Sequence, residues 1–154
     1  MHQLVSLDKL RAKQTPFYYY DTALLKETLQ SIKTEIESYE RFQVHYAVKA
    51  NANTKLLNII SKVGLEADCV SGGEILAAIE AGFSPNKIVY AGVGKSDWEI
   101  ALGIDQEILC FNVESIAELE VINEIAEKKG KIARIALRIN PDVEAHTHAN
   151  ITTG

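Results

Sequence analysis

Lys49 is the residue whose type and setting first suggest covalent chemistry in this sequence. It closes the apolar, strand-like run 42–48 and is followed at once by Ala50 and Asn51. Burying an ammonium group is costly unless the amine is paired, neutralised or chemically useful. A lysine that attacks an aldehyde must be deprotonated, and partial burial favours the neutral amine. Lys49 is therefore either a surface residue that has left the strand or a Schiff-base lysine.

The elements that must position this lysine follow a repeating pattern. Runs rich in apolar and β-branched residues predict strands, and amphipathic helices are predicted between them. The predicted strands lie at 42–48, 65–70, 87–91, 107–111 and 132–139. Strands that alternate with helices in this way form parallel sheets with right-handed crossovers.

The predicted helices are recognised by their caps. A helix from Asp21 to about Ser38 precedes the repeat, and the next begins near Asn53 and ends at Gly64. Three later turns read Ser-x-x-Glu, the capping box in which both side chains satisfy backbone N–H groups of the new helix. These boxes are Ser71 with Glu74, Ser96 with Glu99, and Ser115 with Glu118. Their side chains are predicted to be structural.

Two architectures fit five such units. A doubly wound open sheet can close a domain with five strands, whereas a (β/α)8 barrel needs about 250 residues. The chain has 154 residues, so the strand count alone favours the open sheet. In both architectures the functional side chains gather at the carboxyl ends of the strands. The residues at those ends are Lys49, Asp68, Ser71, Gly92, Gly94, Asn112, Arg138 and Asn140.

Composition excludes several classes of function. The net charge of -5 comes without a basic cluster, so neither nucleic acid nor a membrane surface is an expected partner. Cys69 and Cys110 lack a CxxC or zinc-like spacing and are predicted to be reduced core residues in a cytoplasmic protein. His146 and His148 are spaced like ligands on a strand, but they have no carboxylate or thiolate partner, so no metal site is predicted.

Five segments, in order, resemble the fold type III pyridoxal-phosphate decarboxylases. Segment 46–51 reads Tyr-Ala-Val-Lys-Ala-Asn and is similar to the cofactor-lysine motif of that family. The other four segments are 68–74, 92–96, 111–115 and 137–143. Segment 147–154 resembles the diaminopimelate decarboxylase branch more than the ornithine or arginine branches. The resemblance covers 15–154 and implies an α/β fold, the N-terminal portion of a (β/α)8 barrel with about five parallel strands and intervening helices.

The resemblance also implies a division of the chain. Segment 1–20, with its aromatic run 16–20 of high strand propensity, is expected to belong to the separate β-domain of a full-length enzyme. Segment 21–154 is expected to be an incomplete barrel that binds pyridoxal 5′-phosphate. The full-length enzyme is expected to be a homodimer. An open half-barrel has unpaired edges and an uncovered apolar face, so the chain alone is expected to self-associate and to have little or no activity.

The resemblance implies that three residues of this sequence bind the cofactor. Lys49 matches the lysine that holds pyridoxal phosphate covalently. Asp68 matches an acidic residue that orients and tunes that amine, although it also suits a solvated turn. Arg138 matches a residue that faces the cofactor ring and holds its phenolic oxygen, although it also suits a salt bridge within the barrel.

The activity implied by the resemblance is decarboxylation of meso-diaminopimelate to L-lysine, with the amino acid as the small-molecule partner. Three alternatives stay open at the level of sequence. The chain could belong to an ornithine- or arginine-type decarboxylase, or to a relative that binds the cofactor without catalysis. It could also be an aldolase-like barrel whose lysine reacts directly with a carbonyl substrate.

Overall fold

A computed structural model describes residues 7–39, 41–49 and 51–141. These residues contain one parallel sheet in the order β1-β2-β3-β4-β5. The strands are His45–Ala47 (β1), Glu66–Cys69 (β2), Ile88–Tyr90 (β3), Cys110–Val113 (β4) and Ile135–Leu137 (β5). A doubly wound sheet reverses its strand order at a switch point, whereas a barrel adds strands in sequence. The open sheet favoured by the strand count is therefore wrong, and the barrel-type α/β fold is confirmed.

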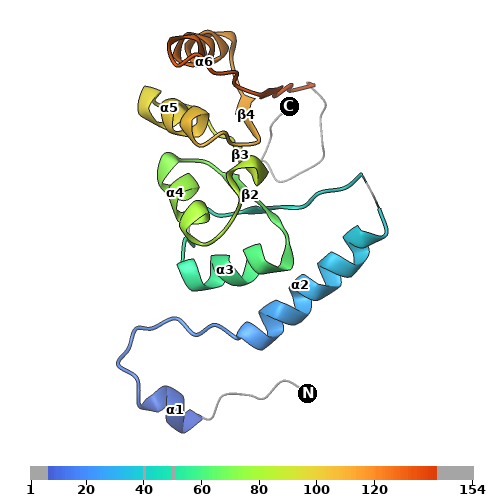
Figure 1. The fold of residues 1–154 in the computed structure, drawn as a ribbon. Coiled ribbons are helices and arrows are strands. Elements are labelled where there is room, and N and C mark those ends of the chain that lie inside the picture. Colours follow the sequence, from blue (N-terminus) through green and yellow to red (C-terminus); the bar gives the residue numbers. More distant parts are fainter. Residues whose placement is uncertain (1–6, 40, 50, 142–154) are drawn as a thin grey trace.

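The helices that connect the strands lie together on one side of the sheet. They are α3 (Thr54–Val63), α4 (Gly72–Glu80), α5 (Asp97–Asp105) and α6 (Ile116–Lys128). Figure 1 shows them stacked in chain order, and each contacts the next. Helix α2 (Thr22–Glu37) contacts α3 and extends the stack. A short helix α1 (Leu7–Arg11) occupies part of the polar lead-in, where no helix was predicted.

The predicted helix starts are confirmed by their hydrogen bonds. Asp21 Oδ1 accepts from the backbone N–H groups of Ala23 and Leu24 at 2.9 and 3.0 Å. Asn53 caps α3 in the same way, and Gly64 ends it with a φ of 99°. A residue with a Cβ resists that left-handed conformation, which is why a glycine stops this helix well.

The strands are shorter than predicted, and the fourth is displaced. It was expected at 107–111 but runs from Cys110 to Val113. The reason is local, because Glu107 belongs to the turn after α5, where its φ is 56° and its N–H donates to Ile104 O at 3.2 Å. Residues 16–20, with their high strand propensity, form no strand with the described part of the sheet.

The core lies between the sheet and the helices. Alternate residues of a strand face opposite sides, and the residues on the helix side of β2, β3 and β4 are all buried. They are Ala67, Cys69, Ile88, Tyr90, Phe111 and Val113. The residues between them, on the helix-free face, are only half-buried, as Asp68, Val89 and Asn112 illustrate. In β5 even Ile135 and Leu137 are exposed, so apolar surface is uncovered at this edge of the sheet.

Both cysteines are free thiols with little reactivity. Cys69 is buried, and burial is the main cause that raises its thiol pKa to about 12. Burial also raises the pKa of Cys110. Because the thiolate is the nucleophile, neither side chain suits covalent catalysis.

Among the described residues, no helix is both long enough and apolar enough to span a membrane.

Candidate functional site

The carboxyl ends of the parallel strands bring the predicted cofactor residues to one edge of the sheet. Ala47 at the end of β1 pairs with Asp68 in β2. At the other side, Arg138 follows β5 directly, and its N–H donates to Val113 O at 2.9 Å, which continues the β4–β5 ladder. By strand alternation Asp68 and Arg138 lie on the helix-free face. The site is therefore open on the side opposite the helices.

Lys49 leaves the strand through a left-handed turn. Val48 is buried and its N–H donates to Asp68 O at 3.1 Å, but Lys49 has a φ of 48° and an exposed side chain. The partial burial expected for a reactive lysine is absent from the described structure. Positive φ is uncommon in residues other than glycine and is enriched at functional positions. No described residue forms a hydrogen bond or ion pair with the Lys49 amine.

Asp68 has a carboxylate oxygen that suits an additional donor. Its Oδ1 is buried and has no hydrogen-bond partner among the described residues. An unpaired buried acceptor is costly, so such an atom calls for a donor that completes the site. Burial is the largest cause that raises the pKa of the Cys69 thiol. The Asp68 charge also raises that pKa, and the Lys49 charge lowers it, so both charged side chains lie near Cys69.

Arg138 makes the salt bridge that the sequence left as its structural alternative. Its Nη1 donates to Glu114 Oε2 at 3.0 Å, and its side chain is 47% exposed. A guanidinium has five N–H donors, so this contact leaves others free for an anion. A hollow of about 400 Å³ adjoins it, lined by Ala91, Asn112, Glu114, Ala136, Leu137 and Arg138. An exposed lysine, an unpaired carboxylate oxygen and a partly free arginine on this edge fit an anionic aldehyde cofactor.

Sequence reasoning missed the role of a second lysine at this edge. Lys95 follows β3, and only 1% of its side chain is exposed. Its Nζ donates to Gly92 O at 2.8 Å, to Asn112 O at 2.9 Å and to Glu118 Oε1 at 2.6 Å. The segment 92–96 was recognised as a motif without a function for this residue. The available signal was a lysine in the loop after a strand, although Lys95 lies five residues beyond the end of β3 and Lys49 two residues beyond the end of β1.

The capping boxes are structural, as predicted, but their glutamates reach further than expected. The Ser71 and Ser115 hydroxyls each accept from the N–H of their glutamate at 3.2 Å. Glu74 accepts from the N–H of Val70 at 2.9 Å, one residue before the serine, and the third box shows the same displacement. Glu74 and Glu118 thus bind the backbone between the preceding strand and the helix.

Glu99 joins two neighbouring units. Its Oε2 accepts from the N–H and the hydroxyl of Ser96 at 3.0 and 2.6 Å, while its Oε1 accepts from Gly72 N–H at 2.8 Å. Burial opposes ionisation, but these hydrogen bonds outweigh it and lower the pKa of Glu99 to about 2. The carboxylate therefore stays charged and connects the starts of α4 and α5.

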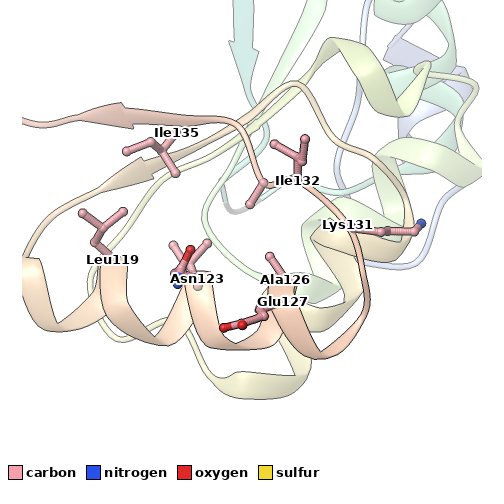
Figure 2. A pocket seen from close by; sticks show the side chains of 9 residues that line it. Leu119, Asn123, Ala126, Glu127, Lys131, Ile132 and Ile135 are labelled. Carbon is pink, nitrogen blue, oxygen red and sulfur yellow. The ribbon is translucent and has the colours of Figure 1, made fainter.

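A second hollow lies away from this edge. Its volume is about 470 Å³. Figure 2 shows it between α6 and the segment that leads into β5. Leu119, Ala126, Ile132 and Ile135 make much of its lining apolar, and it includes none of the predicted cofactor residues.

Within the described ranges no three His, Cys, Asp or Glu side chains form a possible metal site. His146 and His148 lie outside the described residues.

The chain matches a known family over most of its length. Residues 23–154 match the pyridoxal-binding domain of the pyridoxal-dependent decarboxylases, and the chain belongs to this family. The resemblance inferred from the five segments is thereby confirmed.

The similar proteins are mostly longer enzymes of one kind. Diaminopimelate decarboxylase of Bacteroides thetaiotaomicron is 64% identical over 154 residues, which are 100% of this chain and 40% of that protein. The enzyme of the same name from Aquifex aeolicus is 49% identical over 140 residues, 91% of this chain and 33% of that protein. The crystal structure of diaminopimelate decarboxylase from Helicobacter pylori complexed with L-lysine superimposes with a TM-score of 0.85 at 40% identity, covering 94% of this chain and 36% of that chain. The chain thus spans well under half the length of these relatives.

Proposed function

We propose that this chain supplies the lysine-bearing part of a pyridoxal-phosphate-dependent carboxy-lyase that converts meso-diaminopimelate to L-lysine and carbon dioxide. The observation that carries the proposal is Lys49, exposed in a left-handed turn just after β1, the strand that pairs with Asp68, whose Oδ1 has no described partner. The substrate rests on 64% identity with a diaminopimelate decarboxylase and on the likeness to a relative complexed with L-lysine.

The residues divide the work by their chemistry. The Lys49 amine would hold the cofactor aldehyde covalently, and it has no described partner that would have to be displaced first. Asp68 Oδ1, which has no described partner, would accept a hydrogen bond from that nitrogen and orient it. Arg138 keeps guanidinium N–H groups free beyond its contact with Glu114 and would donate them to the phenolic oxygen of the ring. The bound pyridoxal phosphate supplies the electron sink for the pair left when carbon dioxide departs.

We assign residues 1–20 to a separate β-domain of the longer enzyme and residues 21–154 to the cofactor-binding barrel. The lack of strand pairing between 16–20 and the described sheet supports this division. Phe17, Tyr18, Tyr19 and Tyr20 are all exposed. Exposed aromatic side chains in sequence are typical of a surface that another unit covers. One link to the barrel is present, because Asn51 Nδ2 donates to the Tyr20 hydroxyl at 3.3 Å.

We also infer self-association of the chain, homodimerisation of the longer enzyme and a cytoplasmic location. The exposed apolar residues of β5 and the unpaired outer edges of the described sheet support association. Free cysteines are typical of reducing compartments. Sedimentation of the purified chain tests the first inference, since a monodisperse 17.0 kDa monomer contradicts it.

Covalent trapping tests the proposed lysine. The chain is incubated with pyridoxal phosphate, reduced with borohydride and mapped by peptide mass spectrometry. We expect preferential labelling of Lys49, loss of this label in Lys49→Ala, and an unchanged label in the control Lys55→Ala, which removes another exposed lysine. Equal labelling of all exposed lysines contradicts the proposal. Trapping on Lys49 that needs a carbonyl substrate and no cofactor supports the aldolase-like alternative instead.

Product assays test the reaction itself. We expect little carbon dioxide from diaminopimelate with this chain alone, and release that depends on Lys49 in a longer enzyme that contains it. A longer enzyme that labels on Lys49 but releases no carbon dioxide from diaminopimelate is a cofactor-binding relative without this activity. Release from ornithine or arginine in preference to diaminopimelate assigns it to the other branches.

A further inference from the structure

The buried Lys95 is the start of a chain of contacts that ends at Arg138. An ammonium group has three donors, and Lys95 uses all three, on two backbone carbonyls and on Glu118. Its Nζ also lies 5.3 Å from the centre of the Tyr90 ring. A charge so completely paired is fixed in position, and so are the groups that it holds.

Glu118 links Lys95 to Glu114, because its carboxylate binds both residues. Oε1 of Glu118 accepts from Lys95, while Oε2 accepts from the backbone N–H of Glu114 at 3.2 Å. The Glu114 carboxylate is then held from two sides. Its Oε1 accepts from Gly92 N–H at 3.1 Å, and its Oε2 accepts from Arg138 Nη1 at 3.0 Å. Lys95 therefore fixes both the peptide of Glu114 and the loop at Gly92 to which the Glu114 side chain binds.

This arrangement matters because Arg138 itself is poorly confined. Its side chain is about half exposed, and β5, which precedes it, is exposed along its length. The contact with Glu114 is the only hydrogen bond of the guanidinium within the described residues. An exposed ion pair between free side chains is weak, but a carboxylate that is already held in place loses less entropy when it binds.

We propose that Lys95, acting through Glu118 and Glu114, is a positioning residue that sets the orientation of the Arg138 guanidinium. The proposal rests on the proposed function only for what Arg138 then binds. The orientation itself is a property of the chain without cofactor. Lys95 touches no reacting atom in this scheme, in contrast to Lys49.

The test measures the chemical reactivity of Arg138 with phenylglyoxal, followed by peptide mapping. The exposed Arg11 and Arg134 are internal controls in the same sample. We compare Lys95→Met and Glu118→Gln with the control Lys128→Met, which removes an exposed lysine of α6 that pairs only with Glu124 within the described residues. We expect Arg138 to react faster in the first two variants, by about fivefold, the effect of losing an ordinary ion pair. Lys128→Met is expected to leave the rate unchanged.

The two variants separate positioning from simple electrostatics. Lys95→Met removes a positive charge and Glu118→Gln removes a negative one, so a purely electrostatic influence changes the Arg138 rate in opposite directions. Loss of positioning raises the rate in both. Opposite changes, or no change in a folded variant, overturn the proposal. If Arg11, Arg134 and Arg138 all accelerate together because both variants unfold, Lys95 is only structural and the proposal is also overturned.

A second readout connects the inference to the cofactor. Lys95→Met is expected to reduce cofactor labelling of Lys49 by about the same factor as Arg138→Gln, and the double variant is expected to show no further loss. Additive losses in the double variant contradict an action through Arg138. If the unmodified chain shows no preference for Lys49, the proposed function fails, while the Arg138 reactivity still decides the positioning role.

Discussion

A lysine lies in the segment after β1 and another in the segment after β3, and the two differ in burial and in hydrogen-bond partners. Lys95 is almost fully buried and donates to three acceptors. Lys49 is exposed, stands in a left-handed turn and has no described partner. The comparison shows that the buried lysine is the one whose charge is held by two carbonyls and a carboxylate, whereas the predicted cofactor lysine is exposed and has no described partner.

The physical difference is the number of acceptors around each amine. Lys95 donates to two carbonyls and one carboxylate, which hold its amine in place. Lys49 has no such described acceptors. The two lysines are therefore distinguished by their hydrogen-bond partners, and the reactive role of Lys49 stays a prediction.

The largest expected effect comes from exchanging each lysine for methionine. Lys95→Met leaves Glu118 and two backbone carbonyls without their donor, so we expect a loss of about 3 to 5 kcal/mol in the free energy of unfolding. Lys49→Met breaks no described contact and is expected to change it by less than about 0.5 kcal/mol. Urea denaturation of the two variants measures the difference. Equal losses contradict the distinction between the two strand ends.

The next largest effect on stability is expected where Gly72, at the start of α4, packs against Trp98 of α5. A Cβ added at Gly72 falls 2.5 Å from Trp98 Cη2, whereas one at Gly73 meets nothing closer than 3.8 Å. We expect Gly72→Ala to destabilise the chain by about 1 to 3 kcal/mol through overpacking. The control Gly73→Ala is expected to be neutral or slightly stabilising. Thermal unfolding compares the two, and a neutral Gly72→Ala refutes the close packing of Trp98 on α4.

The ionised Glu99 side chain makes the free energy of unfolding depend on pH. Its pKa is lowered to about 2 in the folded chain, below the value of about 4.3 for an unfolded chain. The stabilisation is therefore complete above the unfolded pKa and is lost as pH falls toward 2. At neutral pH we expect Glu99→Gln to cost on the order of 1 kcal/mol. The control is Glu120→Gln on an exposed position of α6.

The pH series decides whether charge is the cause. The difference in stability between the unmodified chain and Glu99→Gln should shrink as pH falls from neutral toward 2, measured by urea denaturation at each pH. A difference that is constant over this range means that the lost contacts do not depend on the charge of Glu99.

The smallest effect has the opposite sign and concerns the β1 end. The left-handed backbone of Lys49 costs about 1 kcal/mol for a residue with a Cβ, and glycine avoids that cost. We expect Lys49→Gly to stabilise the chain by up to about 1 kcal/mol, while Lys49→Ala, which keeps the strain, changes little. If Lys49→Gly is instead destabilising in calorimetry, the left-handed turn at Lys49 is not strained.

Much of the fold could be predicted from local pattern. Asp21, Asn53 and Gly64 cap their helices as expected, because capping depends on a few neighbouring residues. The fourth strand was displaced because Glu107 and Ile108 still donate backbone hydrogen bonds to the last turn of α5, with Glu107 in positive φ, so the strand begins only after this turn. The sheet type was predicted wrongly by strand count, since strand order is a property of pairings between distant segments.

The candidate site could be predicted less completely. The family motifs pointed to Lys49, Asp68 and Arg138, and whether they bind the cofactor stays a prediction. Lys95 and Glu114 were seen only as motif letters, because their roles depend on partners from neighbouring units. The distance in sequence between Lys95 and Glu118, or between Gly92 and Glu114, gives no local signal of contact.

The sequence by itself determined the alternation of strands and helices, the caps and the family, because each is written in residues close together in the chain. Tertiary structure alone decided which lysine is buried and which is exposed. Lys49 and Lys95 both lie in segments that follow strands, but of the two only Lys95 has a carboxylate and two carbonyls within hydrogen-bond distance among the described residues. Two of those acceptors come from β4 and α6, and only folding brings them to the end of β3.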